Sequence, residues 1–209
     1  MDNNELDKER QSVQTDGNGK KKTDTKQSIL MYLHDLVFLL TGVLLVLLLL
    51  FRIVIVSGPS MNDTLIDHDY ILLLSNVFYK NPQQGDIIVA SKDSFKDGEP
   101  IIKRVIATAG QQVDIDFEAG IVYVDGVALQ EDYTRTSTNL AEGMSFPLIV
   151  EEGCIFVMGD NRNVSKDSRN PEIGLIDCRE VLGKAFFILF PGTDDIHTKP
   201  EFDRIGVLS

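Results

Sequence analysis

One long apolar segment limits most strongly how this chain can fold. From Leu36 to Phe51 the sequence carries no charge, and after Arg52 the apolar run resumes to Val56. At ~1.5 Å of rise per helical residue, the first part alone falls short of the ~30 Å hydrocarbon core of a bilayer, whereas the span to Val56 matches it. We therefore predict a transmembrane anchor over residues 29–56, with Arg52 reaching the interface along its aliphatic stem.

The charges that flank this segment predict its orientation. Four lysines lie between positions 20 and 26, and no Lys or Arg follows Val56 until Lys80. Because basic flanks stay in the cytoplasm, we expect a single-pass protein of the cell membrane with a cytoplasmic N-terminus and an extracytoplasmic remainder. A cleaved signal peptide is the alternative. Against it stand the long apolar stretch, the large polar region before it and the lack of an A-x-A-like site after it.

The composition allows one folded domain beside this anchor. Residues 1–28 are mostly Asp, Asn, Gln, Lys and Gly with little to bury, which predicts a disordered cytoplasmic tail. The whole chain of 209 residues is 43% hydrophobic and 25% charged, as in folded proteins. Its 20 basic and 32 acidic residues give a formal net charge of -12, and no basic stripe lies beyond the first thirty residues. We therefore expect no nucleic-acid partner.

Beyond the anchor, the sequence predicts short strands. Runs rich in β-branched and aromatic residues are separated by Gly, Pro, Asn and Asp, and they span residues 70–79, 86–91, 100–108, 113–117, 121–129, 154–159 and 181–190. The pair Asp125-Gly126 between two alternating runs is a hairpin signal. Because no stretch outside the anchor has helical periodicity, we predict a mainly β fold with an antiparallel sheet. Residues 57–112 and 153–209 are expected to form a β core, and residues 113–152 a smaller β subdomain.

The cysteines and histidines form no metal-binding pattern. Cys154 and Cys178 lack C-x-x-C spacing, and His34, His68 and His197 are scattered without an H-E-x-x-H cluster. We therefore predict no metal and no cofactor. The two cysteines are either small buried apolar residues or, in an oxidising compartment, a disulfide, and their spacing does not decide between these.

Two blocks carry a candidate nucleophile and a candidate base. The block S-G-P-S-M-N-D-T-L, from Ser57 to Leu65, places Ser60 in a Gly/Pro turn, although such turns favour these residues for backbone reasons alone. The block P-I-I-K-R-V-I places Lys103 on one strand face with Ile101 and Val105. If that face is buried, desolvation of ~3 to 5 kcal/mol would lower the lysine pKa from ~10.4 to about 7 or 8, so that it could accept a serine proton. If the face is exposed, Lys103 is an ordinary edge-strand charge.

A third block, V-M-G-D-N-R-N-V-S-K-D-S-R, runs from Val157 to Arg169 and concentrates polar side chains after an apolar strand. It is either a solvated turn or a hydrogen-bonded scaffold beside a reactive site.

In this order, behind an N-terminal anchor, the three blocks resemble the signature boxes of the bacterial type I signal peptidases, and of their Gram-positive-like members in particular. The run Q-G-D-I-I-V (Gln84 to Val89) matches a further family strand, so the likeness extends from Leu36 to Phe190. The resemblance implies a membrane-bound serine endopeptidase that removes signal peptides from exported preproteins after small residues at an A-x-A-like site. Its implied partners are secretory preproteins and the lipid bilayer, and we expect a monomer.

The resemblance also assigns roles to single residues. Ser60 is the nucleophile that forms an acyl-enzyme, and Lys103 is the general base and later the general acid. Ser165 matches the serine that hydrogen-bonds and orients the lysine, and Asp167 with Arg169 matches a structural ion pair.

The oxyanion hole would be formed in part by the backbone N–H of Ser60. In some family members a serine hydroxyl two residues earlier is the second donor, and here that place is Gly58, as in Gram-positive-like members. The chain also departs from the family pattern at Asp63, at residues 107–111 and at residues 163–164, and these changes leave the assigned residues in register.

The position of Ser60, four residues beyond Val56, would hold the nucleophile near the outer membrane surface, where the cleavage site of a signal peptide emerges. The resemblance implies a substrate that adds as an extended strand, with shallow apolar pockets for small side chains.

Two other functions are compatible with parts of the sequence. A non-catalytic, membrane-tethered β-domain that binds envelope partners would not need Ser60, Lys103 and the third block together. A self-cleaving repressor-type Ser/Lys protein is cytosolic and carries a DNA-binding helical domain.

Overall fold

The computed structural model describes residues 25–62, 64–95, 98–194 and 198–208. Residues 1–24 of the predicted tail, together with Asp63 and His197, lie outside the described residues. The chain divides into two compact units, residues 1–45 and 46–209.

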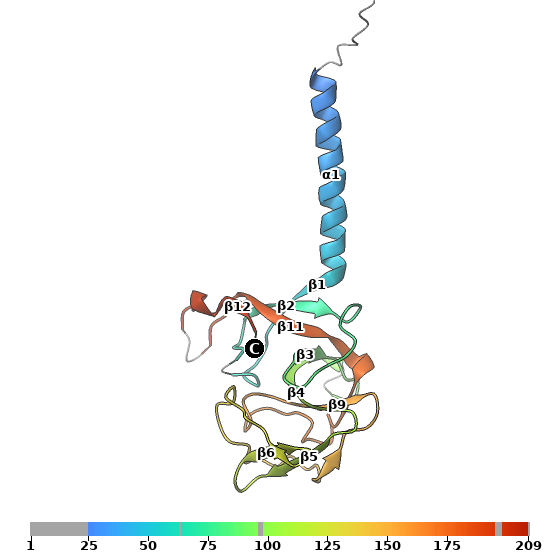
Figure 1. Cartoon of the computed structure of the whole chain (residues 1–209). Coiled ribbons are helices and arrows are strands. Elements are labelled where there is room, and N and C mark those ends of the chain that lie inside the picture. The colour runs from blue at the N-terminus through green and yellow to red at the C-terminus, as the bar shows by residue number, and fades with distance from the viewer. Residues whose placement is uncertain (1–24, 63, 96–97, 195–197, 209) are drawn as a thin grey trace, which may run out of the picture. The chain divides into compact units, whose positions relative to one another are not determined.

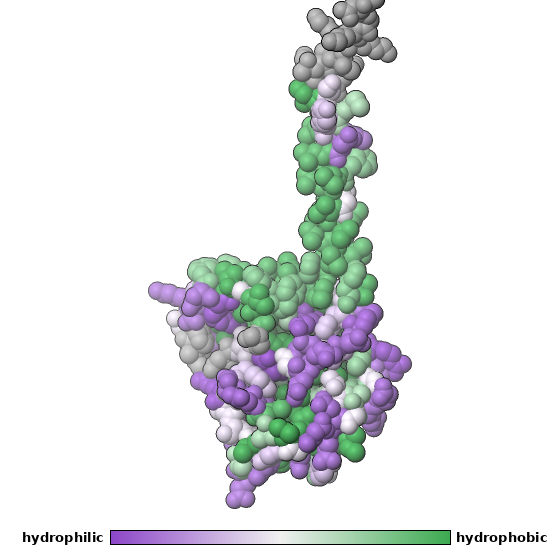
Figure 2. Space-filling model, in the orientation of Figure 1, coloured by the Kyte–Doolittle hydropathy of each residue, from purple (hydrophilic) through white to green (hydrophobic). Residues whose placement is uncertain are grey.

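A single long helix, α1 (Thr25–Leu50), precedes the strands (Figure 1). Its 23 residues from Ser28 to Leu50 are long and apolar enough, by length and composition, to cross a membrane. At ~1.5 Å per residue they extend about 34 Å, more than the hydrocarbon core requires. Figure 2 shows hydrophobic side chains along most of the helix surface.

The anchor expected over residues 29–56 ends earlier than predicted, because the helix stops at Leu50 and Phe51–Ile55 form strand β1. The prediction was wrong at this boundary. Ile53, Val54 and Ile55 are β-branched and favour extended backbone, and β1 pairs in antiparallel register with β2 (Tyr70–Ser75). The helix reaches membrane length by beginning earlier in the sequence instead.

The larger sheet contains eight of the described strands, in the order β1-β2-β11-β3-β4-β9-β10, with β12 paired to β11. Every recorded pairing is antiparallel, which confirms the predicted fold class. The remaining strands of this sheet are β3 (Ile87–Ala90), β4 (Ile101–Thr108), β9 (Cys154–Met158), β10 (Ile176–Asp177), β11 (Val181–Phe190) and β12 (Gly206–Val207).

A second, four-stranded sheet has the order β7-β6-β5-β8, formed by β5 (Gln112–Asp116), β6 (Ile121–Val124), β7 (Val127–Ala128) and β8 (Leu148–Ile149). Asp125 and Gly126 both have positive φ, 51° and 78°, as a tight hairpin turn requires. Val113 and Val122 of this sheet share an apolar cluster with Phe156 of the larger sheet. The subdomain boundary at residues 113–152 stays a prediction.

Strand β4 lies inside the larger sheet, between β3 and β9. Its six central residues, 102–107, are all buried. Any polar side chain on this strand must therefore find a partner inside the protein.

Cys154 and Cys178 are free thiols and are partly buried. Burial raises the pKa of both thiols, with a further contribution from nearby carboxylates such as Asp177.

Candidate active site

Ser60 lies on a loop that closes on itself between β1 and β2. The N–H of Val56 donates to the carbonyl of Asp69 and the N–H of His68 donates to the carbonyl of Val56, each at 2.9 Å. Inside the loop, the N–H of Gly58 donates to Asp67 Oδ1 at 2.8 Å. We call residues 56–69 the Ser60 loop. Gly58 has a φ of +88°, a conformation that other residues rarely adopt, so a glycine is needed at this turn.

The structure brings Ser60 and Lys103 together. Lys103 Nζ lies 2.9 Å from Ser60 Oγ and 2.9 Å from the carbonyl oxygen of Ile102. Only 4% of Lys103 is exposed, although Ser60 itself is half-buried. The lysine lies opposite Ile88, which is fully buried, in the register of β3 and β4. The predicted apolar environment of Lys103 is therefore present, and the alternative of an exposed edge-strand charge is wrong.

The third sequence block folds against the Ser60 loop. Asn161 donates from its backbone N–H to the carbonyl of Ser60 at 3.1 Å and from Nδ2 to the carbonyl of Pro59 at 3.0 Å. Gly159 fits between the carbonyl oxygen of Ser60 and the side chain of Ser165, where a Cβ atom would collide with both. The block is therefore a packed scaffold and not a solvated turn.

Asp167 and Arg169 form the expected ion pair. Two parallel hydrogen bonds of 2.8 Å join the guanidinium to the carboxylate, and both side chains are fully buried. Asp167 also accepts the N–H of Gly159 at 3.0 Å, so the pair fixes the backbone next to Ser60.

Two of the expected support residues differ in detail. Ser165 is 2% exposed, but its Oγ has no hydrogen-bond partner in the described part of the chain, so the expected bond to Lys103 is not made. The hydroxyl packs against Gly159 instead. The N–H of Gly58 is already bound to Asp67, so it does not point freely toward an oxyanion.

A cleft of about 480 Å³ opens onto the pair. One wall is the chain from Val54 to Met61 and another is the segment from Glu99 to Lys103, so that Ser60 and Lys103 both face the cavity. The remaining lining residues are Val89, Phe95, Val164 and Lys166. The mostly apolar lining suits a peptide with small apolar side chains.

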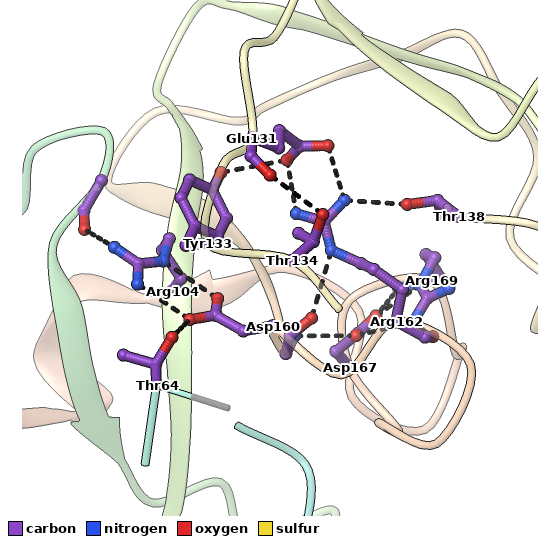
Figure 3. Close-up of polar contacts among 12 residues, drawn as sticks. Thr64, Arg104, Glu131, Tyr133, Thr134, Thr138, Asp160, Arg162, Asp167 and Arg169 are labelled. Atoms are coloured by element: carbon purple, nitrogen blue, oxygen red, sulfur yellow. Dashed lines mark hydrogen bonds and ion pairs between the residues drawn. The ribbon is translucent and has the colours of Figure 1, made fainter. Parts of the chain in front are cut away.

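Sequence reasoning missed a network of buried arginines beside the site (Figure 3). Arg104, which follows Lys103, is 1% exposed and makes two bonds to Asp160, from Nε at 2.9 Å and from Nη2 at 2.8 Å. Asp160 also accepts the hydroxyl of Thr64, on the Ser60 loop, at 2.5 Å. The available signal was a second charge inside the apolar β4 run, because a buried arginine requires an acidic partner.

Among the described residues, no group of three or more His, Cys, Asp or Glu side chains could hold a metal ion. The contact between Ser60 and Lys103 places a serine hydroxyl beside a lysine amine.

Comparisons with known proteins identify the family of the chain. A family model described as "Signal peptidase, peptidase S26" matches residues 29–190. Signal peptidase I of Bacillus licheniformis is 32% identical over 180 residues, covering 82% of this chain and 94% of the relative. Signal peptidase I T of Bacillus subtilis (strain 168) is 33% identical over 202 residues, covering 91% and 99%.

A solved structure, signal peptidase I of Enterococcus faecalis V583, is 34% identical, with a TM-score of 0.41 and coverage of 50% of this chain and 97% of that chain. The family match covers most of the present sequence and includes all three sequence blocks. The chain therefore belongs to the signal peptidase family, peptidase S26.

Proposed function

We propose that this protein is a type I signal peptidase, a membrane-bound serine endopeptidase that removes signal peptides from exported preproteins. The observation that carries the proposal is the 2.9 Å contact between Ser60 Oγ and the buried Lys103 Nζ, two residues that line the cleft. The family membership and the relatives named signal peptidase I support it.

The proposed chemistry uses Ser60 as nucleophile and Lys103 as base. The neutral amine takes the hydroxyl proton while Oγ attacks the carbonyl carbon of the scissile bond. The bond to nitrogen then breaks, Lys103 returns the proton to the leaving amine of the mature protein, and the signal peptide stays on Ser60 as an ester. Water, deprotonated by Lys103, hydrolyses that ester and restores the hydroxyl.

The backbone N–H of Ser60 would stabilise the oxyanion that forms in each step. Gly58 would act by allowing the turn that presents Ser60. Ser165, Asp167 and Arg169 would act by packing and hydrogen bonding around Gly159.

The cleft supports specificity for small residues before the cut. A preprotein strand lying between the Val54–Met61 wall and the Glu99–Lys103 wall would direct alternate side chains toward the apolar lining residues. Small apolar side chains, as in an A-x-A-like site, would pack against these residues.

The proposed location is the cell membrane, with the N-terminus in the cytoplasm and the β unit outside. Helix α1 has the length and composition of an anchor. Within the β unit, Ile53 and Ile55 of β1 and Val207 of β12 are more than half exposed. Tyr70 of β2 and Phe190 of β11 are 41% and 48% exposed. These strands are neighbours in the sheet, so the exposed apolar side chains suit contact with lipid. We propose a monomer with the bilayer and secretory preproteins as partners.

Purified full-length protein in detergent should cut a model preprotein after a small residue, as read by mass spectrometry of both products. Ser60→Ala and Lys103→Ala should abolish cleavage, because one removes the nucleophile and the other the base. Lys80→Ala, at an exposed lysine, is the matched control and should cut normally. Equal processing, or none, by all four proteins would instead favour a membrane-tethered binding domain.

A further inference from the structure

A segment of the smaller sheet's connection reaches into the arginine network beside the site. Residues 129–142 link β7 toward β8, and we call them the strap. The strap contributes Glu131, Tyr133 and Thr138 to the network, and Figure 3 shows all three directed at the arginines.

Glu131 holds Arg162 with both carboxylate oxygens. Arg162 Nη1 donates to Glu131 Oε2 at 2.7 Å and Nη2 donates to Oε1, while Nη1 also reaches Thr138 Oγ1 at 2.8 Å. The Arg162 side chain is 1% exposed and that of Glu131 12%. Burial disfavours the charged guanidinium, yet the hydrogen bonds and charge of Glu131 outweigh it and raise the pKa of Arg162. Without this carboxylate, Arg162 would be a buried charge lacking its ion-pair partner.

Arg162 is in turn hydrogen-bonded to the backbone beside Ser60. Its Nε donates to the carbonyl of Gly159 at 3.2 Å, and Gly159 lies directly against the carbonyl oxygen of Ser60. Arg162 also follows Asn161, which donates to that same Ser60 carbonyl. A shift of Arg162 would therefore move the backbone that holds the nucleophile.

Tyr133 contacts Arg104, the residue that follows Lys103 in the chain. Its ring centroid lies 4.0 Å from Arg104 Cζ and 5.9 Å from Arg162 Cζ, so the ring lies within cation–π range of both guanidinium groups. The hydroxyl donates to Glu131 at 3.0 Å, which ties the ring to the carboxylate. Arg104 directly follows Lys103 on β4, so the ring braces the strand that carries the amine.

We propose that the strap is a positioning element for the Ser60/Lys103 pair, with Glu131 and Tyr133 as its positioning residues. The inference rests on the proposed function and adds to it residues that act through the two arginines. No strap residue lines the cleft, so substrate binding should not depend on them. Displacement of reacting groups by about 1 Å can cost about 10²-fold in rate, so the effect should appear in kcat.

The test compares conservative and disruptive changes in the full-length protein. Glu131→Gln keeps the side-chain shape and removes the charge. Tyr133→Phe keeps the ring over Arg104, and Tyr133→Leu removes it. Glu118→Gln, in the exposed turn between β5 and β6, is a matched control for loss of one negative charge. Each variant is measured for kcat and KM on a preprotein, for melting temperature, and for amide hydrogen exchange.

We expect Glu131→Gln and Tyr133→Leu to lower kcat by about tenfold or more with KM within about twofold of the parent. Tyr133→Phe should retain more of kcat than Tyr133→Leu, because the cation–π face survives. Amides of residues 56–62 and 157–169 should exchange faster in the two damaging variants, while strand β11 should not change. The control should match the parent in every readout.

An unchanged kcat, a change confined to KM, or faster exchange throughout the β unit would each overturn the positioning role. If Tyr133→Leu does not fold, Tyr133→Phe and Glu131→Gln still decide the test. An equal loss of kcat in these two variants would assign the positioning role to the hydrogen bond between the Tyr133 hydroxyl and the Glu131 carboxylate. If the parent protein cuts no preprotein, the proposed function fails, and the exchange data still decide whether the strap holds residues 56–62 and 157–169.

Discussion

At the scale of single residues, the proposed activity depends most on the position of Lys103. An amine with 4% exposure, 2.9 Å from a serine hydroxyl, is placed to exchange a proton with it. Alternation along β4 placed Lys103 on one face with Ile101 and Val105 but left open whether that face is buried, and the interior position of the strand in the sheet buries it.

Lys103→Arg tests whether Lys103 acts as a base and not merely as a positive charge. A guanidinium stays protonated at all accessible pH values, so it cannot accept the serine proton. We expect kcat to fall by about 10²- to 10⁴-fold, the usual contribution of general base catalysis, in a preprotein cleavage assay. Activity close to that of the parent would show that charge alone suffices.

Gly159→Ala tests the close contact behind the nucleophile. A Cβ at this position would collide with the carbonyl oxygen of Ser60 and with Ser165, so the Ser60 loop must shift. Overpacking of this kind costs about 1–3 kcal/mol, and we expect a lower melting temperature with loss of cleavage. Gly206→Ala is the control, because a Cβ there meets nothing within 4 Å. Equal behaviour of the two variants would refute the contact.

Contacts of single residues that depend on tertiary packing could not be predicted from the sequence. The motif indicated that Ser165 hydrogen-bonds Lys103, whereas in the structure the buried Ser165 hydroxyl has no hydrogen-bond partner in the described part of the chain. Likewise, nothing in the run E-D-Y predicts that Glu131 and Tyr133 meet Arg162 and Arg104, because these contacts join segments distant in the chain.

At the scale of elements, strand patterns were predicted well where a run was long and alternating. The runs that form β4 and β11 have clear apolar patterns. The central residues of β4 are all buried, and buried residues alternate with partly buried ones along the first half of β11. Strands β8, β10 and β12 have two residues each, too few for a period to be recognised. The boundary between α1 and β1 was missed because apolar residues continue across it, and pairing with β2 determines where the helix ends.

An ion pair ties the start of β3 to β11 and yields a pH prediction. Partial burial tends to raise the pKa of Asp86, but hydrogen bonds from Lys184 and Tyr79 outweigh it and hold the pKa below its usual value. A carboxylate with a lowered folded-state pKa stabilises the fold above its unfolded-state pKa of about 3.9, and this stabilisation is lost as pH falls through the folded value.

Asp86→Asn should therefore destabilise the β unit by about 1.5–3 kcal/mol at pH near 7, the range for hydrogen bonds to a charged group. The difference from the parent should shrink below about pH 4 as Asp86 becomes protonated. Chemical unfolding at both pH values measures this. Asp132→Asn, at an exposed carboxylate, is the control. A stability difference that grows on acidification would contradict the assignment.

At the scale of the whole molecule, the described chain has an apolar helix long enough to span a membrane, followed by a β unit. The sequence predicted both parts and their order, since a long apolar run and a set of short alternating runs are distinct patterns. The strand order could not be derived from these patterns, because β11 lies between β2 and β3 although it comes last but one in the chain.

The proposed topology predicts which parts of the molecule a protease can reach. In intact cells stripped of their wall, an added protease should degrade the β unit and spare an epitope tag placed before residue 1. Detergent permeabilisation should expose the tag as well. Protection of the β unit in intact cells, with digestion of the tag, would reverse the orientation.

The central claim is that Ser60 becomes covalently attached to the signal peptide. The most direct measurement is mass spectrometry of the enzyme after rapid acid quenching during preprotein turnover. We expect the peptide that contains Ser60 to gain the mass of the signal-peptide fragment less one water, and Ser60→Ala to show neither adduct nor cleavage. Cleavage that persists in Ser60→Ala, or an adduct on another residue, would contradict the account.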